Sequence, residues 1–269
     1  MFVQITLTTG PGQPVYITDH TSTLMGIIPE RVSDRTGIVR TTIVVSSLIL
    51  AAVVMNLVAT LAAVSVVGSD VSETIAFATV VIASELAFLL VGVAYLRFQS
   101  SFQLPIRTPT RQVIPYLVGG LVSGFVTVFL QSAITDAVVP AIELSPGFTE
   151  YTSLGQVTGN GLVVGIVLSL TLIGPVEEFL FRGVVQGRLR EALGPASAIG
   201  IASAAFALFH VYPVTLLAPP LVVVAHMAAY YTVMGVIFGW VYHRTDTLVA
   251  PVLVHGTFNA VLFASSLLA

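Results

Sequence analysis

The chain has 269 residues, of which 56% are hydrophobic and 9% are charged, and its formal net charge is −3. A soluble domain usually carries about 25% charged residues, so this composition excludes an ordinary water-soluble domain and indicates an integral membrane protein. The negative net charge argues against nucleic acid as a partner, and the absence of cysteine excludes disulfides, a thiolate nucleophile and cysteine metal ligands.

Seven segments are predicted as membrane spans, since a helix needs roughly 20 apolar residues to cross the hydrocarbon core of a bilayer. In chain order they are residues 41–67, 74–96, 113–139, 161–185, 196–211, 221–242 and 248–268. The fifth segment is short, and the fourth qualifies only if its two glutamates are tolerated in the membrane. The sequence therefore predicts an all-α, polytopic transmembrane helix bundle of about seven to eight helices.

Arginine residues mark one side of this predicted bundle. They lie before the first segment and in the connections after the second, fourth and sixth segments, whereas the connections after the first and third segments contain acidic residues and no arginine. Because positive residues stay on the cytoplasmic side, we expect a multi-pass plasma-membrane protein with a cytoplasmic N-terminus. Residues 1–39 are predicted to form a polar N-terminal tail, and residues 40–269 the transmembrane domain.

Three groups of polar and aromatic residues lie inside the predicted spans, where ionisable side chains are costly and usually functional. The groups are Glu177, Glu178 and Arg182; Phe206 and His210; and His255 and Asn259. Residues four apart share one helix face. At a rise of about 1.5 Å per residue, the three groups lie roughly 12 to 21 Å from the cytoplasmic ends of their spans, so we expect them to meet in one layer of the membrane.

Local spacing separates the two adjacent glutamates. Glu178 precedes Arg182 by four residues, which is the better order for an ion pair on a helix, whereas Glu177 is rotated by about 100° and faces elsewhere. Gly174 and Pro175, directly before them, can bend the helix and open space for water. The ion pair alone could be purely structural, but two histidines, an asparagine and a second glutamate at matching depth favour a catalytic or transport site.

These residue types predict hydrolysis of an amide by activated water. A glutamate and a histidine can act together as a general base on water, and a second histidine with an asparagine can stabilise an oxyanion. No serine or aspartyl protease motif is evident. Glu177, His210 and His255 could alternatively hold a zinc ion, but the His-Glu-x-x-His spacing is absent. We therefore predict no cofactor, with a divalent metal such as zinc as the alternative.

The remaining interior polar and small residues are assigned to contacts between helices. Glu85 and Gln131 are expected to pair within the bundle, with the lining of a substrate cavity as the alternative, and His226 is expected to be a helix-contact or lining residue rather than a ligand. Gly235 and Gly239 are expected to allow close helix packing and to need no other role.

The three motifs in this order resemble those of the CPBP family, which holds type II CAAX prenyl endopeptidases and bacteriocin-processing or self-immunity proteins. They read EEFLFRGVVQGRL, AAFALFH and GVIFGWVYHRTDTLVAPVLVHGTFN, and the resemblance covers residues 160–263. This resemblance implies an intramembrane endopeptidase in which Glu177 activates water with the assistance of His210. It also implies that His255 and Asn259 stabilise the oxyanion.

The same resemblance implies supporting residues and a class of substrate. Glu178 and Arg182 would hold the motif together, with Glu178 able to share in catalysis, and Phe206 would support the site as a wall beside the imidazole of His210. The implied partner is a lipidated or membrane-associated peptide in the lipid bilayer, processed in the manner of CAAX prenyl proteins. Family members are also described as metalloendopeptidases.

Three other functions are alternatives to CAAX-type processing: processing of an unprenylated membrane peptide, a bacteriocin self-immunity or scaffold role, and proton-coupled transport. Transport would use Glu85, Asp136 and Glu177 as proton sites, but the sequence contains no inverted internal repeat. A scaffold would have no need to retain a costly glutamate in lipid.

Overall fold

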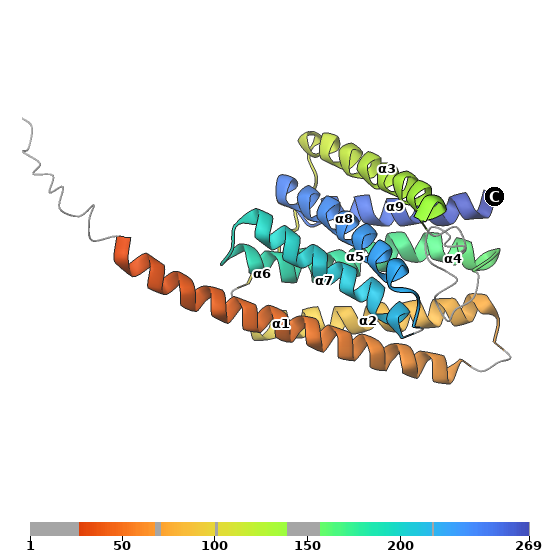
Figure 1. The fold of residues 1–269 in the computed structure, drawn as a ribbon, viewed down its shortest axis with the longest axis horizontal. Helices are drawn as coiled ribbons and strands as arrows, with labels where there is room; N and C mark the ends of the chain where they lie inside the picture. Colours follow the sequence, from red (N-terminus) through yellow and green to blue (C-terminus); the bar gives the residue numbers. More distant parts are fainter. Residues whose placement is uncertain (1–26, 68–70, 100–101, 139–156, 217, 269) are drawn as a thin grey trace, which may run out of the picture.

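The computed structural model describes residues 27–67, 71–99, 102–138, 157–216 and 218–268. These residues contain helices and no strand, and seven of the helical stretches are long and apolar enough to cross a membrane. They are Arg35–Val66, Glu73–Phe98, Arg111–Thr135, Asn160–Arg190, Pro195–Thr215, Leu221–Thr245 and Val249–Leu268. The predicted all-α polytopic bundle is therefore confirmed (Figure 1). Residues 1–26 of the predicted tail and the side chain of Asp136 lie outside the described part of the chain.

The N-terminal helices α1 (Ile27–Val66) and α2 (Glu73–Phe98) pack against each other, and α1 extends beyond the other helices at its N-terminal end (Figure 1). Residues 27–39 are helical, although the sequence analysis assigns them to the tail. Pro29 lies in the first turn, where its missing N–H leaves no helical hydrogen bond unmade. No further proline follows, so the helix continues without interruption into its apolar part.

The C-terminal helices surround the fourth span. α7 (Pro195–Thr215) packs along α8 (Leu221–Thr245), and α9 (Val249–Leu268) packs against the fourth span. α3 (Ile114–Val138), which follows the 3₁₀ turn η2 (Arg111–Val113), covers α8 and α9 (Figure 1). The fourth span is therefore in contact with spans from both halves of the chain.

The fourth span, Asn160–Arg190, is called the motif helix below, and it alternates between α-helical and π-helical turns. Its segments are α4 (Asn160–Leu168), the π-helical η4 (Ser169–Ile173), α5 (Gly174–Glu178), the π-helical η5 (Phe179–Gln186) and α6 (Gly187–Arg190). Pro175 lies in the first turn of α5 and has no N–H to donate. Glu177 and Glu178 lie between two π-helical segments, and because such turns are often found at functional sites, the two glutamates are candidate functional residues.

Aromatic rings fix the motif helix against α2 and α7. Phe181 of η5 lies edge-on to Phe88 of α2, with ring centroids 5.9 Å apart, and to Phe209 of α7, at 5.2 Å. Phe206 approaches the same ring at 5.3 Å. Each such pair stabilises the fold by roughly 0.5–1.5 kcal/mol beyond its burial, so α2, the motif helix and α7 are held in a defined register.

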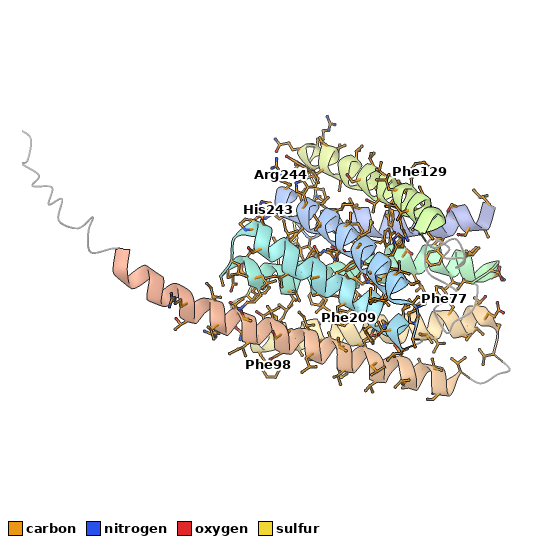
Figure 2. All side chains as sticks on the ribbon, viewed as in Figure 1. Phe77, Phe98, Phe129, Phe209, His243 and Arg244 are labelled. Atoms are coloured by element: carbon orange, nitrogen blue, oxygen red, sulfur yellow. The ribbon has the colours of Figure 1, made fainter. Side chains whose placement is uncertain are left out.

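The outer surface of the bundle carries large apolar side chains. Figure 2 shows Phe98 and Phe129 at the outside of the bundle, and they are 85% and 74% exposed. Phe209, in contrast, lies inside. An apolar surface of this kind would be unfavourable in water, so it supports a multi-pass integral membrane protein.

Two glycines allow α9 to approach the motif helix closely. A Cβ atom on Gly174 would lie 2.9 Å from the backbone nitrogen of Gly256, and a Cβ atom on Gly256 would lie 2.9 Å from the carbonyl oxygen of Ser169. Both neighbours are backbone atoms, which cannot rotate away. Because His255 directly precedes Gly256, this close approach determines how far the imidazole of His255 lies from the motif helix.

We expect Gly256→Ala to destabilise the protein by about 1–3 kcal/mol, the usual range for overpacking a well-packed interior. Thermal unfolding in detergent measures the effect. Gly200→Ala is the control, because no atom lies within 4 Å of a Cβ at that helical position, and an alanine there is expected to be neutral or slightly stabilising. An equal loss of stability in both variants would contradict the importance of the close approach.

Candidate active site

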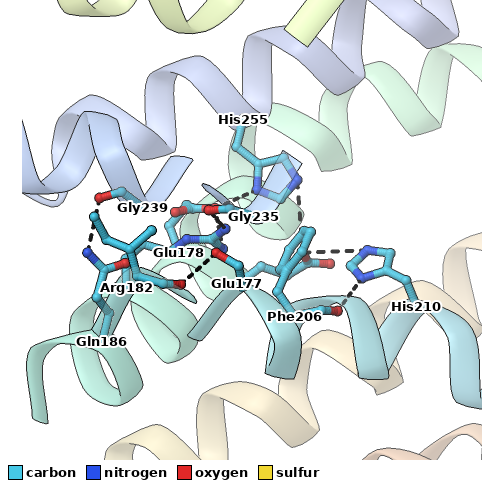
Figure 3. Close-up of polar contacts among 11 residues, drawn as sticks. Glu177, Glu178, Arg182, Gln186, Phe206, His210, Gly235, Gly239 and His255 are labelled. Carbon is cyan, nitrogen blue, oxygen red and sulfur yellow. Dashed lines mark hydrogen bonds and ion pairs between the residues drawn. The ribbon is translucent and has the colours of Figure 1, made fainter. Parts of the chain in front are cut away.

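A row of buried side chains joins the motif helix to α8. Arg182 Nη1 donates to Glu178 Oε1 at 3.0 Å, and Arg182 Nη2 donates to the carbonyl oxygen of Gly235 at 3.1 Å. One turn further on, Gln186 Nε2 donates to the carbonyl oxygen of Gly239 at 3.0 Å (Figure 3). From the sequence, Gly235 and Gly239 are expected to allow close packing and to need no other role. That expectation is incomplete, because their carbonyl groups also accept hydrogen bonds from the motif helix, and a Cβ atom on Gly239 would lie 2.8 Å from Gln186 Oε1.

Glu178 also holds the imidazole of His255. Its Oε1 atom accepts a hydrogen bond from His255 Nδ1 at 2.8 Å, and both side chains are almost completely buried. A carboxylate oxygen accepts, so Nδ1 carries the hydrogen and Nε2 points away from Glu178. The His255 ring stacks on Phe238, with centroids 4.4 Å apart and an angle of 18° between the planes. Its orientation is therefore fixed from two sides.

Glu177 faces two imidazole rings rather than the arginine. Its Oε2 atom lies 3.9 Å from Nε2 of His210 and 3.9 Å from Nε2 of His255 (Figure 3). These separations exceed the range of a direct hydrogen bond, about 2.7–3.2 Å. The same oxygen is buried and has no hydrogen-bond partner within the described ranges. Three polar atoms that converge at this spacing are suited to hold a bridging water molecule.

His210 is oriented by its own helix. Its Nδ1 atom donates to the carbonyl oxygen of Phe206 at 2.9 Å, so Nε2 of the neutral ring has a lone pair directed towards Glu177. The ring lies between Phe206 and Tyr231, with centroids 4.4 and 4.1 Å away. The side chain of His210 is 23% exposed, compared with 8% for Glu177. The site is therefore most open beside His210.

The structure thus brings Glu177, His210 and His255 together from three different spans. Asn259 lies one turn after His255 on α9 and is partly exposed. Its side chain forms no hydrogen bond with another described residue. Asn259 therefore shares a face of α9 with His255, and its part in the site stays a prediction.

Among the described residues, no group of three or more His, Asp or Glu side chains is arranged to hold a metal ion. Glu177, His210 and His255, the residues of the zinc alternative, face one another with separations of 3.9 Å from Glu177 Oε2 to each Nε2 atom.

Three residues of the site are absent from the sequence-based set, and each had a spacing signal. Gln186 follows Arg182 by four residues, as Arg182 follows Glu178, and it is completely buried. Tyr231 and Phe238, which stack on the two imidazole rings, lie seven residues apart on α8 and thus share one face of that helix.

Two further interior polar residues make contacts between helices. His226 Nε2 lies 2.8 Å from Thr135 Oγ1 and joins α8 to α3, which confirms the predicted helix contact. Glu85 of α2 is buried, and the carboxyl group of Glu177 is its neighbour on the motif helix. Its Oε2 atom has no hydrogen-bond partner among the described residues, so its pairing within the bundle stays a prediction.

Residues 159–261 match the family model described as type II CAAX prenyl endopeptidase Rce1-like. The matched range contains all three motifs and begins at the start of the motif helix. Comparisons with curated proteins and with solved structures gave no match.

Proposed function

Because residues 159–261 of the chain form a type II CAAX prenyl endopeptidase Rce1-like domain of the CPBP family of intramembrane proteases, we propose that Glu177 activates the water that attacks a peptide bond. The observation that carries this proposal is the convergence of three atoms: Glu177 Oε2 lies 3.9 Å from Nε2 of His210 and from Nε2 of His255. A water molecule between them can donate to the carboxylate while a substrate approaches from the open side, beside His210.

In the proposed first step, the oxygen atom of this water forms a bond to the carbonyl carbon of the substrate. One water proton passes to the carboxylate of Glu177, which acts as the general base. The other water hydrogen is donated to Nε2 of His210, which is free to accept because Nδ1 donates to the carbonyl group of Phe206. Two acceptors thus orient the water for attack.

The oxyanion of the tetrahedral intermediate is stabilised by Asn259 and by Nε2 of His255. Since Nδ1 of His255 already donates to Glu178, Nε2 donates as well only when the ring is protonated. The charges of the site are compatible with this state. Arg182 balances Glu178, and a protonated His255 balances Glu177, so that the buried charges are paired.

The intermediate breaks down when the proton held by Glu177 passes to the nitrogen of the leaving amine and the C–N bond breaks. The products are one carboxyl group and one amine, and no side chain forms a covalent bond to the substrate. Glu178 is 0% exposed behind His255. We therefore assign it, together with Arg182, to the positioning of His255 and of the motif helix rather than to contact with substrate.

The proposed substrate is a lipidated or membrane-associated peptide that reaches the site from the bilayer, with a CAAX-type prenylated C-terminus as the first candidate. Residues from two other spans, His210 and His255, lie beside Glu177 inside the helix bundle, and a lipid chain on the substrate would favour entry into such a site. The predicted cytoplasmic N-terminus places the arginine-rich connections on the side where such peptides are made.

The direct test is cleavage of a quenched fluorescent peptide by the purified protein in detergent, with mass spectrometry to identify the bond that is cleaved. A farnesylated CAAX-type peptide and the same peptide without lipid are compared, each with and without a metal chelator. We expect cleavage of the farnesylated peptide that persists in the chelator. If the chelator abolished cleavage and zinc restored it, a metal mechanism would replace the proposed one. If the protein cleaved neither peptide, the CAAX-type substrate would be contradicted.

A further inference from the structure

Glu85 of α2 is a buried acid that the mechanism above does not use. It is 4% exposed, and its Oε2 atom has no hydrogen-bond partner among the described residues. The register of α2 is fixed by Phe88, about one turn further on, whose ring lies edge-on to Phe181 and Phe209. These contacts hold Glu85 against the motif helix rather than towards lipid.

Glu85 and Glu177 form a pair of neighbouring carboxyl groups. Glu85 precedes Phe88 by three residues and Glu177 precedes Phe181 by four, so the contact between these two rings places both acids about one turn before it on neighbouring helices. The two carboxyl groups are neighbours, and the Oε2 atom of Glu85 is buried without a partner in the described part of the chain. Two neighbouring ionised carboxylates repel each other, and burial disfavours both charges. Carboxyl pairs in such surroundings hold one proton between them.

The neighbouring charges indicate which member of the pair carries the proton. His210 of α7 and His255 of α9 face Glu177, and Arg182 of η5 and Tyr231 of α8 are further ionisable neighbours on other elements. Arg182 balances the charge of Glu178, with Nη1 3.0 Å from Oε1. An ionised Glu85 would add an unpaired negative charge in the membrane interior. The proton therefore belongs on Glu85 when Glu177 acts as the base.

We propose that Glu85 is a positioning residue for peptide hydrolysis, in which its protonated carboxyl group donates a hydrogen bond to the carboxylate of Glu177. This hydrogen bond holds one oxygen atom of Glu177 on the side of α2 and so directs the other towards the imidazole rings and the attacking water. Glu85 forms no bond to the substrate, and its proton stays in place during the reaction. The inference rests on the proposed function, because it takes Glu177 as the base.

Two neutral substitutions of Glu85 isolate the effect of its hydrogen-bond donor. Glutamine is neutral and offers an N–H donor, whereas leucine has a similar size and donates nothing. We expect Glu85→Gln to retain most of the wild-type kcat. We expect Glu85→Leu to lower kcat by up to about 100-fold, the effect of a small misplacement of a catalytic group, with little change in KM. Glu73→Gln, at an exposed position in the first turn of the same helix, is the matched control.

Infrared spectroscopy of the purified protein tests the carboxyl pair without any cleavage assay. A protonated carboxyl group has a C=O stretching band that is separate from the bands of ionised carboxylates. We expect this band in the wild type at neutral pH, its loss in Glu85→Gln and its retention in Glu73→Gln. Because glutamine closely matches glutamate in shape, this comparison also decides the question if Glu85→Leu does not fold.

Three results would overturn the proposal: no band lost in Glu85→Gln, an unchanged kcat in Glu85→Leu, or a loss of kcat in Glu85→Gln as large as that in Glu85→Leu. The last result would make Glu85 a proton donor rather than a positioning residue. If the wild type cleaves no peptide while the infrared band behaves as expected, the proposed function fails and the carboxyl pair stands. The two failures are therefore distinguishable.

Discussion

Glu177→Gln is expected to reduce peptide cleavage by roughly 100- to 10,000-fold, the usual contribution of a general base, while the fold and the binding of peptide are retained. Glutamine has nearly the same size as glutamate and keeps one oxygen atom, but it cannot accept a proton from water. The Oε2 atom of Glu177 forms no hydrogen bond with a described residue. The substitution therefore removes the proton acceptor without breaking a hydrogen bond of that atom.

Measurement of kcat and KM with the fluorescent peptide separates loss of chemistry from loss of binding. We expect the decrease to appear in kcat, because the carboxylate acts on the attacking water and not on the peptide. Thermal unfolding in detergent checks that the variant is folded. Glu73→Gln, which makes the same chemical change at an exposed position on α2, should cleave like the wild type.

A different outcome would assign the base elsewhere. If Glu177→Gln retained more than about a tenth of the wild-type kcat, well outside the range expected for loss of a general base, His210 would have to activate water without it. If the protein instead carried protons across vesicle membranes and Glu177→Gln abolished that flux, the transport alternative would replace the protease. Both measurements use the same two purified proteins.

The spans and the motif groups could be predicted from the sequence, because both depend on spacing along a single helix. Runs of apolar residues set the lengths of the spans, and residues four apart, such as Glu178 and Arg182, share one face. Counting residues from the ends of the spans was also sufficient to predict that Glu177, His210 and His255 lie in one layer. The structure brings these three side chains together.

Contacts that depend on helix packing could not be predicted in this way. The spacing of residues along α2 does not relate Glu85 to Glu177. The two residues are brought together by helix packing, since the aromatic contacts of Phe88 set the register of α2 against its neighbours. The π-helical turns were also not foreseeable, since apolar runs in α- and π-helices read alike. The hydrogen bonds to the carbonyl groups of Gly235 and Gly239 could be predicted only if it were known that α8 packs against Arg182 and Gln186.

Arg182→Met is expected to destabilise the protein by about 3–5 kcal/mol, because it leaves the carboxylate of Glu178 buried without its cation. Both side chains of this ion pair are at most 1% exposed. Arg182 also contacts two aromatic rings, since its guanidinium carbon lies 4.5 Å from the centroid of Phe206 and 5.3 Å from that of Phe238. Methionine fills a similar volume, so the loss reports mainly on the missing charge and hydrogen bonds. Unfolding by denaturant in detergent micelles measures it.

The double variant Glu178→Gln with Arg182→Met removes both charges and is expected to recover much of the lost stability, since replacing both members of a buried ion pair is often nearly neutral. Recovery would show that the single variant suffers from an unpaired carboxylate. No recovery would mean instead that the hydrogen bond from Arg182 to the carbonyl group of Gly235 carries the stability.

Recovery of stability should not be accompanied by recovery of cleavage. Glu178 is the residue that holds Nδ1 of His255 at 2.8 Å, and a neutral glutamine would not favour the protonated imidazole that the oxyanion requires. We therefore expect a folded double variant with strongly reduced kcat. If the double variant cleaved peptide like the wild type, the charge of Glu178 would not be needed for the reaction. His255 would then stabilise the oxyanion without a neighbouring carboxylate at position 178. The ion pair is thus expected to be replaceable for folding and required for catalysis, which is a physical reason for a membrane protein to retain two charges at this depth.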